Sequence, residues 1–113
     1  MLKLVKSCCK RHVSSSNAKF AIASLNPAQL DAVLSPVNAA ALVTAGPGSG
    51  KTKVISHRIE RLTIDLNQDP KSILAITFTN KASLEMKHRL QKLLPKETAQ
   101  HINVGTFHSF STR

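Results

Sequence analysis

The stretch that decides the fold is "AGPGSGKT", Ala45 to Thr52. A continuous apolar run, "AAALVTA" (39–45), precedes it and is predicted to form a buried parallel strand. The segment "KTKVISHRIERLTIDL" (51–66) follows, and its apolar residues recur at helical spacing: Ile55, Ile59, Leu62 and Leu66. A glycine-rich loop between a buried strand and a helix is the usual setting of a phosphate-binding loop.

The chemistry of this loop suits a phosphate chain. Its pattern departs from G-x-x-x-x-G-K-[ST] only at Ala45. The glycines, Gly46, Gly48 and Gly50, let backbone N–H groups turn toward an anion that the helix N-terminus also attracts. Lys51 can reach the β- and γ-phosphates, and the Thr52 hydroxyl can ligate Mg²⁺. The alternative is a glycine-rich turn without a ligand; the Gly-Lys-Thr ending favours phosphate.

Further helices and strands surround the loop. Before it, "LNPAQLDAVLS" (25–35) reads as a short helix with Asn26 as N-cap, Gln29 at the capping-box position, and an apolar side of Leu30, Val33 and Leu34. After it, "SILAITFT" (72–79) reads as a second buried strand. "INVGTF" (102–107) reads as a third strand, and "HSFSTR" (108–113) begins another helix.

A helix is also predicted between these two strands. Asn80 can cap it, it runs to Leu94, and Pro95 stops it. Its inward residues are expected to be Ala82, Met86, Leu90 and Leu93. The alternation of helices and strands predicts an α/β fold, with a parallel sheet flanked by helices.

Composition favours a polyanionic partner. The 113 residues suffice for one small domain, and 16 Lys and Arg stand against 6 Asp and Glu. Nucleic acid is the first candidate, and a merely solvated basic surface is the alternative. No apolar run approaches the roughly 18 residues of a membrane helix, so a soluble chain without a membrane partner is expected.

Residues 1–24 differ from the rest of the chain. They are basic, contain no acid and include three consecutive serines, Ser14 to Ser16. A disordered basic extension is the preferred interpretation, and an organelle transit peptide is the alternative. The domain is therefore expected to span 25–113.

The cysteines of the chain, Cys8 and Cys9, are adjacent. This spacing fits neither a metal site nor a disulfide framework, so it indicates a reducing compartment. Palmitoylation beside the basic residues is a weaker alternative.

Four blocks in order carry a family resemblance: "LNPAQLDAV", "AGPGSGKTKV", "ITFTNKASLEMKHRL" and "VGTFHSF". Together they resemble the N-terminus of UvrD/Rep-like superfamily 1 DNA helicases, from Leu25 to Phe110. That family typically has alanine where this chain has Ala45. The resemblance implies part of a RecA-like P-loop NTPase domain, with ATP and Mg²⁺ as cofactors and a role in processes such as DNA repair.

The resemblance also assigns a nucleotide site. It implies that Gln29 reads adenine, since a side-chain amide can pair with N6 and N7 of that base; the alternative is that Gln29 only caps its helix. Many family members have arginine where Lys53 stands, so no purine contact is implied there. The implied catalytic residues are Lys51 and Thr52, with Thr52 as the Mg²⁺ ligand. The implied cofactor-binding residues are Gln29, Ala45, Gly46, Pro47, Gly48, Ser49, Gly50, Lys51 and Thr52.

Two further blocks imply contacts with single-stranded DNA or a single-strand–duplex junction. The residues are Thr77, Phe78, Thr79, Asn80, Lys81, Thr106, Phe107 and His108. Hydroxyls and amides at a helix start suit phosphates, and Phe78 offers a stacking face. Taken without the resemblance, Phe78 reads as core and Asn80 as a cap. The other histidines stand in no constellation and are expected on the surface: His12, His57, His88 and His101.

Groups for ATP hydrolysis are missing from these residues. Hydrolysis needs an acid for Mg²⁺ and a group that activates water, and no apolar strand ending in Asp-Glu occurs here. The leading hypothesis is an N-terminal fragment of an ATP-hydrolysing, 3′–5′ DNA helicase, catalytically incomplete alone. The alternative is a short module that binds ATP and single-stranded DNA without turnover; an unrelated phosphate-loop kinase is disfavoured. Nuclear localisation is expected in a eukaryote, with mitochondria open because of residues 1–24.

Overall fold

The computed structural model describes residues 24–112. The predicted basic extension lies outside these residues except for Ser24, as do Cys8, Cys9 and His12. The chain divides into two compact units, one up to Arg58 and one from Ile59 onward, and the boundary falls within helix α2 (Lys51–Ile64). In the part of the chain that the structure describes, no helix is long and apolar enough to cross a membrane.

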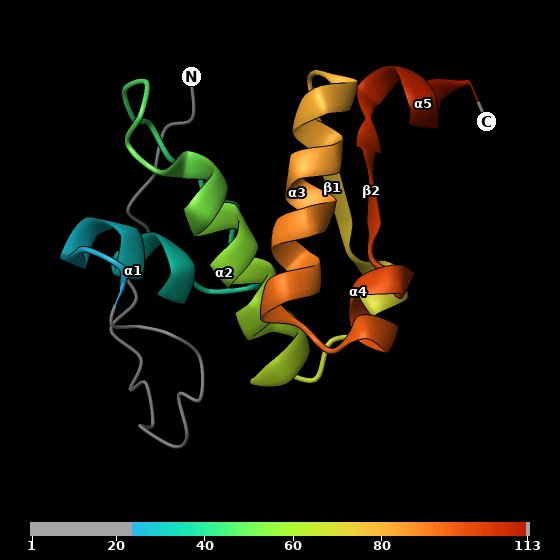
Figure 1. Cartoon of the computed structure of the whole chain (residues 1–113). Coiled ribbons are helices and arrows are strands. Elements are labelled where there is room, and N and C mark those ends of the chain that lie inside the picture. Colours follow the sequence, from blue (N-terminus) through green and yellow to red (C-terminus); the bar gives the residue numbers. More distant parts are fainter. Residues whose placement is uncertain (1–23, 113) are drawn as a thin grey trace. The chain divides into compact units, whose positions relative to one another are not determined.

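The first unit contains helix α1 (Pro27–Leu34) and the beginning of α2 (Figure 1). The predicted capping box of α1 is confirmed: the Asn26 side chain accepts a hydrogen bond from the Gln29 N–H, and the Gln29 side chain accepts one from the Asn26 N–H. A small apolar cluster joins α1 to α2. Its buried members are Ala32, Val33 and Val54, and Leu25, Leu34 and Val43 pack against them.

The predicted strand at 39–45 is wrong. The structure has no strand there, and the sheet contains only β1 (Leu74–Thr77) and β2 (Asn103–Thr106). A strand is defined by the hydrogen bonds of a ladder, and an apolar composition alone provides no pairing partner. The run is only half-buried at Leu42 and Val43, and it reaches the phosphate loop as irregular backbone.

The second unit is built on a pair of parallel strands, so the α/β class is confirmed (Figure 1). Leu74 pairs with Asn103, and Thr77 pairs with Thr106. Helix α3 (Asn80–Leu93) connects the strands, as the crossover of a parallel pair requires. Three short helices complete the unit: η2 (Pro70–Ser72), α4 (Lys96–His101) and α5 (Phe107–Ser111). Helix α4 was not predicted, although Pro95 ends α3 as expected.

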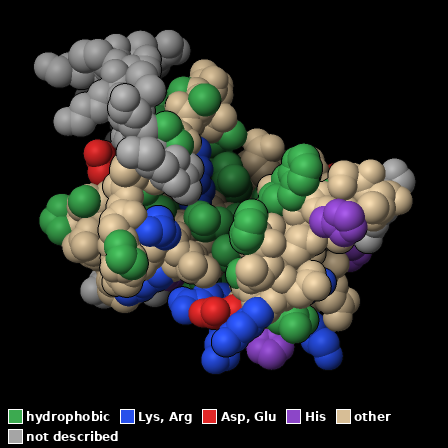
Figure 2. Space-filling view, turned by 90° about the horizontal axis from the view of Figure 1, so that it is seen from above, with side chains coloured by type: hydrophobic (Ala, Val, Ile, Leu, Met, Phe, Trp, Pro, Cys, Tyr) green, Lys and Arg blue, Asp and Glu red, His purple; other side chains and the backbone are tan. Residues whose placement is uncertain are grey.

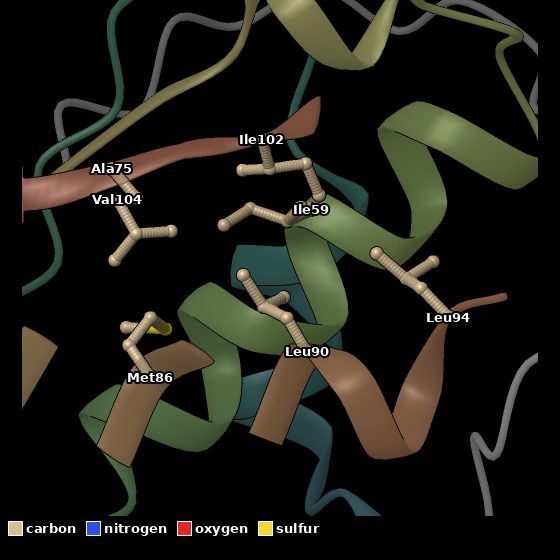
Figure 3. Packing of buried hydrophobic residues seen from close by; sticks show 7 residues of the cluster. All are labelled: Ile59, Ala75, Met86, Leu90, Leu94, Ile102 and Val104. Atoms are coloured by element: carbon tan, nitrogen blue, oxygen red, sulfur yellow. The ribbon is translucent and has the colours of Figure 1, made fainter. Parts of the chain in front are cut away.

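The core of this unit lies between α3 and one face of the strands (Figure 3). Met86 and Leu90 of α3 are buried as predicted, and Leu93 packs beside them. The full cluster, all labelled in Figure 3, is Ile59, Ala75, Met86, Leu90, Leu94, Ile102 and Val104. Leu90 is only 1% exposed, which makes it the most deeply buried member.

Two expectations about burial are corrected. β1 was predicted to be buried on both faces, but Leu74 and Ile76 are each about half exposed, because only the face of Ala75 meets the core. Ile55 of α2 and Leu66, which lies beyond the end of α2, are exposed, whereas the polar side chains of Ser56, His57 and Glu60 are buried. His57 is therefore not a surface residue. The spacing of apolar residues did not predict the burial of His57, because the buried side of α2 is partly polar.

Candidate functional site

The phosphate loop runs from Ala45 to Gly50 and leads directly into α2. A tight turn closes it: both the N–H and the hydroxyl of Ser49 donate to the carbonyl oxygen of Gly46, at 3.3 and 2.6 Å. Gly48 has φ of 75° and Gly50 has φ of 82°. Residues with side chains rarely adopt this left-handed region, so the loop geometry requires glycine at these positions.

Lys51 lies folded across the loop. Its ammonium donates hydrogen bonds to the carbonyl oxygens of Ala45, at 2.7 Å, and Gly46, at 3.0 Å. An ammonium has three N–H donors, so it can hold the loop and still offer a donor to an anion. The neighbouring Thr52 is half-buried at the start of α2, where backbone N–H groups lack partners within the helix. A positive charge, a hydroxyl and free helical N–H groups thus meet at one place.

Gln29 reaches from α1 onto the same loop. Its Nε2 donates to the carbonyl oxygen of Ser49 at 2.9 Å, while its Oε1 accepts from the Asn26 N–H at 3.1 Å. A side-chain amide has two N–H donors and an oxygen with two lone pairs. One donor and one lone pair therefore remain for a further ligand. The capping role of Gln29 is confirmed, and its reading of adenine stays a prediction.

The shape of the loop fits a nucleotide. A Cβ placed on Gly50 would lie 2.7 Å from Gln29 Nε2, so the side chain of Gln29 passes close to the loop backbone. Gly46 and Gly48 have nothing within 4 Å of an added Cβ, which leaves the outer side of the turn open. The backbone N–H groups, Lys51 and Gln29 are the donors that a triphosphate and a purine need. The chemistry of these residues therefore suits a purine nucleoside triphosphate.

Lys53 turns away from the loop in a different direction. Its ammonium donates a hydrogen bond to the carbonyl oxygen of Ser24. This contact engages the ammonium group of Lys53.

The second set of candidate residues lies at the carboxyl edge of the sheet. Because β1 and β2 are parallel and Thr77 pairs with Thr106, the segments that follow the two strands emerge side by side. Phe78 is 99% exposed and Phe107 is 72% exposed. The alternative interpretation of Phe78 as a core residue, which its aromatic side chain favours when the family resemblance is set aside, is wrong. Two exposed aromatic rings at one sheet edge are suited to stacking on unpaired bases.

A shallow hollow lies at this edge. Its lining residues are Phe78, Thr79, Asn80, Thr106, His108 and Ser109, and all except Ser109 belong to the predicted DNA-contacting set. Thr79 caps α3 by accepting from the Ala82 N–H at 3.1 Å, so the cap is Thr79 and not Asn80. Thr106 caps α5 in the same way, accepting from the Ser109 N–H at 3.2 Å. Lys81 is exposed on the first turn of α3.

Thr77 differs from the other members of this set. Its Oγ1 lies 3.1 Å from the carbonyl oxygen of Thr79 and 3.4 Å from that of Gly105, and it contacts the hydroxyl of Ser83. These partners come from the end of β1, from α3 and from β2. The hydroxyl therefore ties the two strand ends together and is not directed to the surface. Ser83, which is buried, was missed from the sequence because serine at a helical position gives no signal.

The sequence of this chain is similar to sequences of known proteins. The family of the UvrD/REP helicase N-terminal domain matches residues 25–113. The chain belongs to this family. It is 54% identical over 72 residues to the ATP-dependent DNA helicase PcrA of Leuconostoc citreum, an alignment that covers 64% of this chain and 10% of that protein. The fold expected from the resemblance, part of a RecA-like domain with a parallel sheet flanked by helices, is confirmed.

Other relatives within the UvrD/REP family give the same picture. The chain is 48% identical over 93 residues to DNA helicase II of Haemophilus influenzae, covering 79% of this chain and 12% of that protein. It is 46% identical over 92 residues to PcrA of Bacillus subtilis, covering 81% of this chain and 12% of that protein. The chain thus spans 10–12% of the length of these relatives.

Proposed function

We propose that this chain binds ATP–Mg²⁺ through the loop from Ala45 to Thr52, with Gln29 reading the adenine base. The observation that supports this most directly is the hydrogen bond from Gln29 Nε2 to the Ser49 carbonyl oxygen, which attaches a base-reading amide to a phosphate loop. Lys51 and the N–H groups of the loop hold the β- and γ-phosphates, and Thr52 holds Mg²⁺. ATP supplies the phosphoanhydride whose cleavage is the energy source of helicases.

The carboxyl edge of the sheet is the proposed site for single-stranded DNA. Phe78 and Phe107 stack on bases, and the N-termini of α3 and α5 with Lys81 contact phosphates. Thr77 supports this edge from within through its contacts with Ser83 and Gly105. Lys and Arg side chains are more abundant than acids on the face shown in Figure 2, in agreement with a polyanionic partner.

The activity proposed for the complete protein is ATP-dependent unwinding of DNA with 3′–5′ polarity. The relatives are DNA helicases by name, and the match to their N-terminal domain family supports the proposal. For the 113 residues themselves we propose binding of ATP and single-stranded DNA without turnover. The unit that contains the phosphate loop ends at Arg58, and its only acidic residue, Asp31, is exposed on α1. The described residues contain no cluster of His, Cys, Asp or Glu that suits a metal ion.

Equilibrium binding of ATP in Mg²⁺ tests the nucleotide site. Lys51→Ala is expected to weaken ATP binding at least tenfold, which corresponds to about 1.4 kcal/mol, because it removes a charge-assisted phosphate contact. Lys96→Ala, which removes an exposed lysine of the other unit, is the matched control and is expected to leave the affinity unchanged. Equal affinities of the wild type and the Lys51 variant would refute the site.

The Mg²⁺ ligand and the absence of turnover have separate tests. Thr52→Val is expected to remove the gain in ATP affinity that Mg²⁺ provides, whereas Thr52→Ser, which keeps the hydroxyl, is expected to retain it. Phosphate release is expected to stay at background with or without single-stranded DNA. Hydrolysis that disappears in Lys51→Ala would contradict the proposal that these residues bind without turnover.

A further inference from the structure

Arg58 makes an unusual set of contacts with the end of α1. Its Nη1 donates to the carbonyl oxygens of Val33, at 3.0 Å, and Ser35, at 2.8 Å, and lies 3.4 Å from that of Ala32. Its Nη2 donates to the carbonyl oxygen of Pro36 at 3.2 Å. One guanidinium on α2 thus contacts four carbonyl oxygens in the last turn of α1 and just beyond it.

These carbonyl oxygens need a partner. The last carbonyls of a helix have no acceptor role within that helix, and the negative end of the helix dipole lies there. Helix α1 has no basic residue in its own last turn. Arg58 supplies donors and a positive charge from another helix, and the Ser35 hydroxyl also donates to the Ala32 carbonyl oxygen, at 2.9 Å. An isolated helix of eight residues is marginal in water, so α1 depends on such contacts for its position.

The other end of α1 is attached to the same segment of chain. Gln29, in the first turn, donates to the Ser49 carbonyl oxygen in the phosphate loop. Between the two ends, Val33 is fully buried and packs with Val54 of α2. Helix α1 is therefore fixed at its start by Gln29, along its side by Val33 and at its end by Arg58. Loss of the last contact leaves α1 free to tilt about the remaining two.

A tilt of α1 would change what Gln29 presents. Pairing with adenine N7 and N6 requires one N–H and one lone pair of the amide to be aligned with the base at once. Guanine presents N7 and O6, which are both acceptors, so Oε1 would oppose O6. Discrimination between the purines thus depends on the orientation of this amide, whereas binding of the phosphates depends on the loop.

We infer that Arg58 is a positioning residue for purine selection: by holding the C-terminal end of α1, it orients Gln29 for adenine. This inference rests on the proposed role of Gln29. It concerns a residue that contacts neither the base nor the phosphates. Arginine is required because its planar fork reaches several carbonyl oxygens, whereas lysine offers a single point charge.

The test compares the affinities of ATP, GTP and inorganic tripolyphosphate, each with Mg²⁺, for the 113-residue chain. The wild type is expected to prefer ATP over GTP, and Gln29→Ala is expected to abolish that preference. Arg58→Met and Arg58→Lys are expected to lower the preference roughly fivefold or more, the lower range of one bidentate base contact, while tripolyphosphate binds as in the wild type. Unchanged tripolyphosphate affinity also shows that the loop of each variant is folded.

The outcomes separate the inference from the proposed function. If Gln29→Ala abolishes the preference but both Arg58 variants keep it, the positioning role of Arg58 is wrong and the reading of adenine stands. If the wild type shows no preference, or Gln29→Ala retains it, the proposed reading of adenine fails and the inference fails with it. A parallel loss of ATP, GTP and tripolyphosphate binding in folded Arg58 variants would show a general role in the loop and overturn the inference.

A measurement on the wild type remains decisive even if the variants do not fold. Hydrogen exchange of the amides from Leu30 to Leu34 in α1 is expected to slow when ATP binds and to stay unchanged with tripolyphosphate. The reason is that only the base contacts Gln29 and thereby restrains α1. Equal slowing with both ligands, or none with ATP, would overturn the inference.

Discussion

A Cβ on Gly50 would lie 2.7 Å from the Nε2 of Gln29, so the loop and α1 approach closely at this point. Gly50 also has φ of 82°. Gly50→Ala is therefore expected to destabilise the chain by about 1–2 kcal/mol because of the left-handed backbone, while the flexible end of Gln29 moves aside. Urea unfolding followed by circular dichroism measures the change.

Gly46→Ala is the matched control for this prediction. Gly46 lies in the same loop, but an added Cβ there meets nothing within 4 Å and its φ is not positive. The free energy of unfolding is expected to change by less than about 0.5 kcal/mol, as for an unconstrained surface position. Equal losses in the two variants would mean that the left-handed backbone of Gly50 is not what restricts the loop.

The cap of α3 can be tested by two neighbouring substitutions. Thr79 Oγ1 accepts from the Ala82 N–H, whereas Asn80 is the first residue of the helix. Thr79→Ala is expected to cost about 0.5–2 kcal/mol of stability, the usual effect of losing an N-cap. Asn80→Ala is expected to cost clearly less. The opposite order in thermal unfolding would restore the prediction from the sequence that Asn80 is the cap.

The core between α3 and the strands predicts a large contrast within one helix. Leu90 is 1% exposed, and Leu84 is 59% exposed. Leu90→Ala is expected to destabilise the chain by about 2–5 kcal/mol through lost burial and a remaining cavity. Leu84→Ala is expected to change stability by less than about 0.5 kcal/mol. Similar unfolding midpoints in urea for the two variants would show that this core is packed differently.

The proposed DNA edge predicts a specific salt dependence. If Lys81 contacts one phosphate of single-stranded DNA, Lys81→Ala should reduce the slope of log affinity against log salt by about 0.7. Lys96→Ala is the control, because α4 precedes β2 and lies away from the carboxyl edge. Fluorescence anisotropy at several salt concentrations measures both slopes. A slope that Lys96→Ala lowers as much as Lys81→Ala would indicate diffuse basic attraction without a defined edge.

Local patterns predicted the parts of the fold that depend on nearby residues. The capping box at Asn26 and Gln29, the end of α3 before Pro95, and the burial of Met86 and Leu90 all follow from residues within a few positions of one another. The strand at 39–45 was predicted wrongly because pairing depends on a partner elsewhere in the chain. The burial of His57 was missed for a similar reason, since it depends on what packs against α2.

The candidate site shows the same division. The turn before α2 was predicted from the spacing of its glycines, and the left-handed backbone at Gly48 and Gly50 agrees with that prediction; the phosphate contact of Lys51 stays a prediction. The contacts of Arg58 could not be predicted, since its acceptors are main-chain oxygens, which every residue possesses. The inward orientation of Thr77 was hidden likewise, because it depends on the pairing of β1 with β2 and on Ser83 across from it.

The account's central claim is that Gln29 and the phosphate loop bind one ATP molecule together. A titration of the ¹⁵N-labelled chain with a non-hydrolysable ATP analogue and Mg²⁺, followed by NMR, tests it most directly. The predicted result is that the amides of Gly46, Gly48 and Gly50 and the side-chain Nε2 of Gln29 shift together, with one dissociation constant. Shifts of the loop amides without any change at Gln29, or no shift in the loop at all, would contradict the claim.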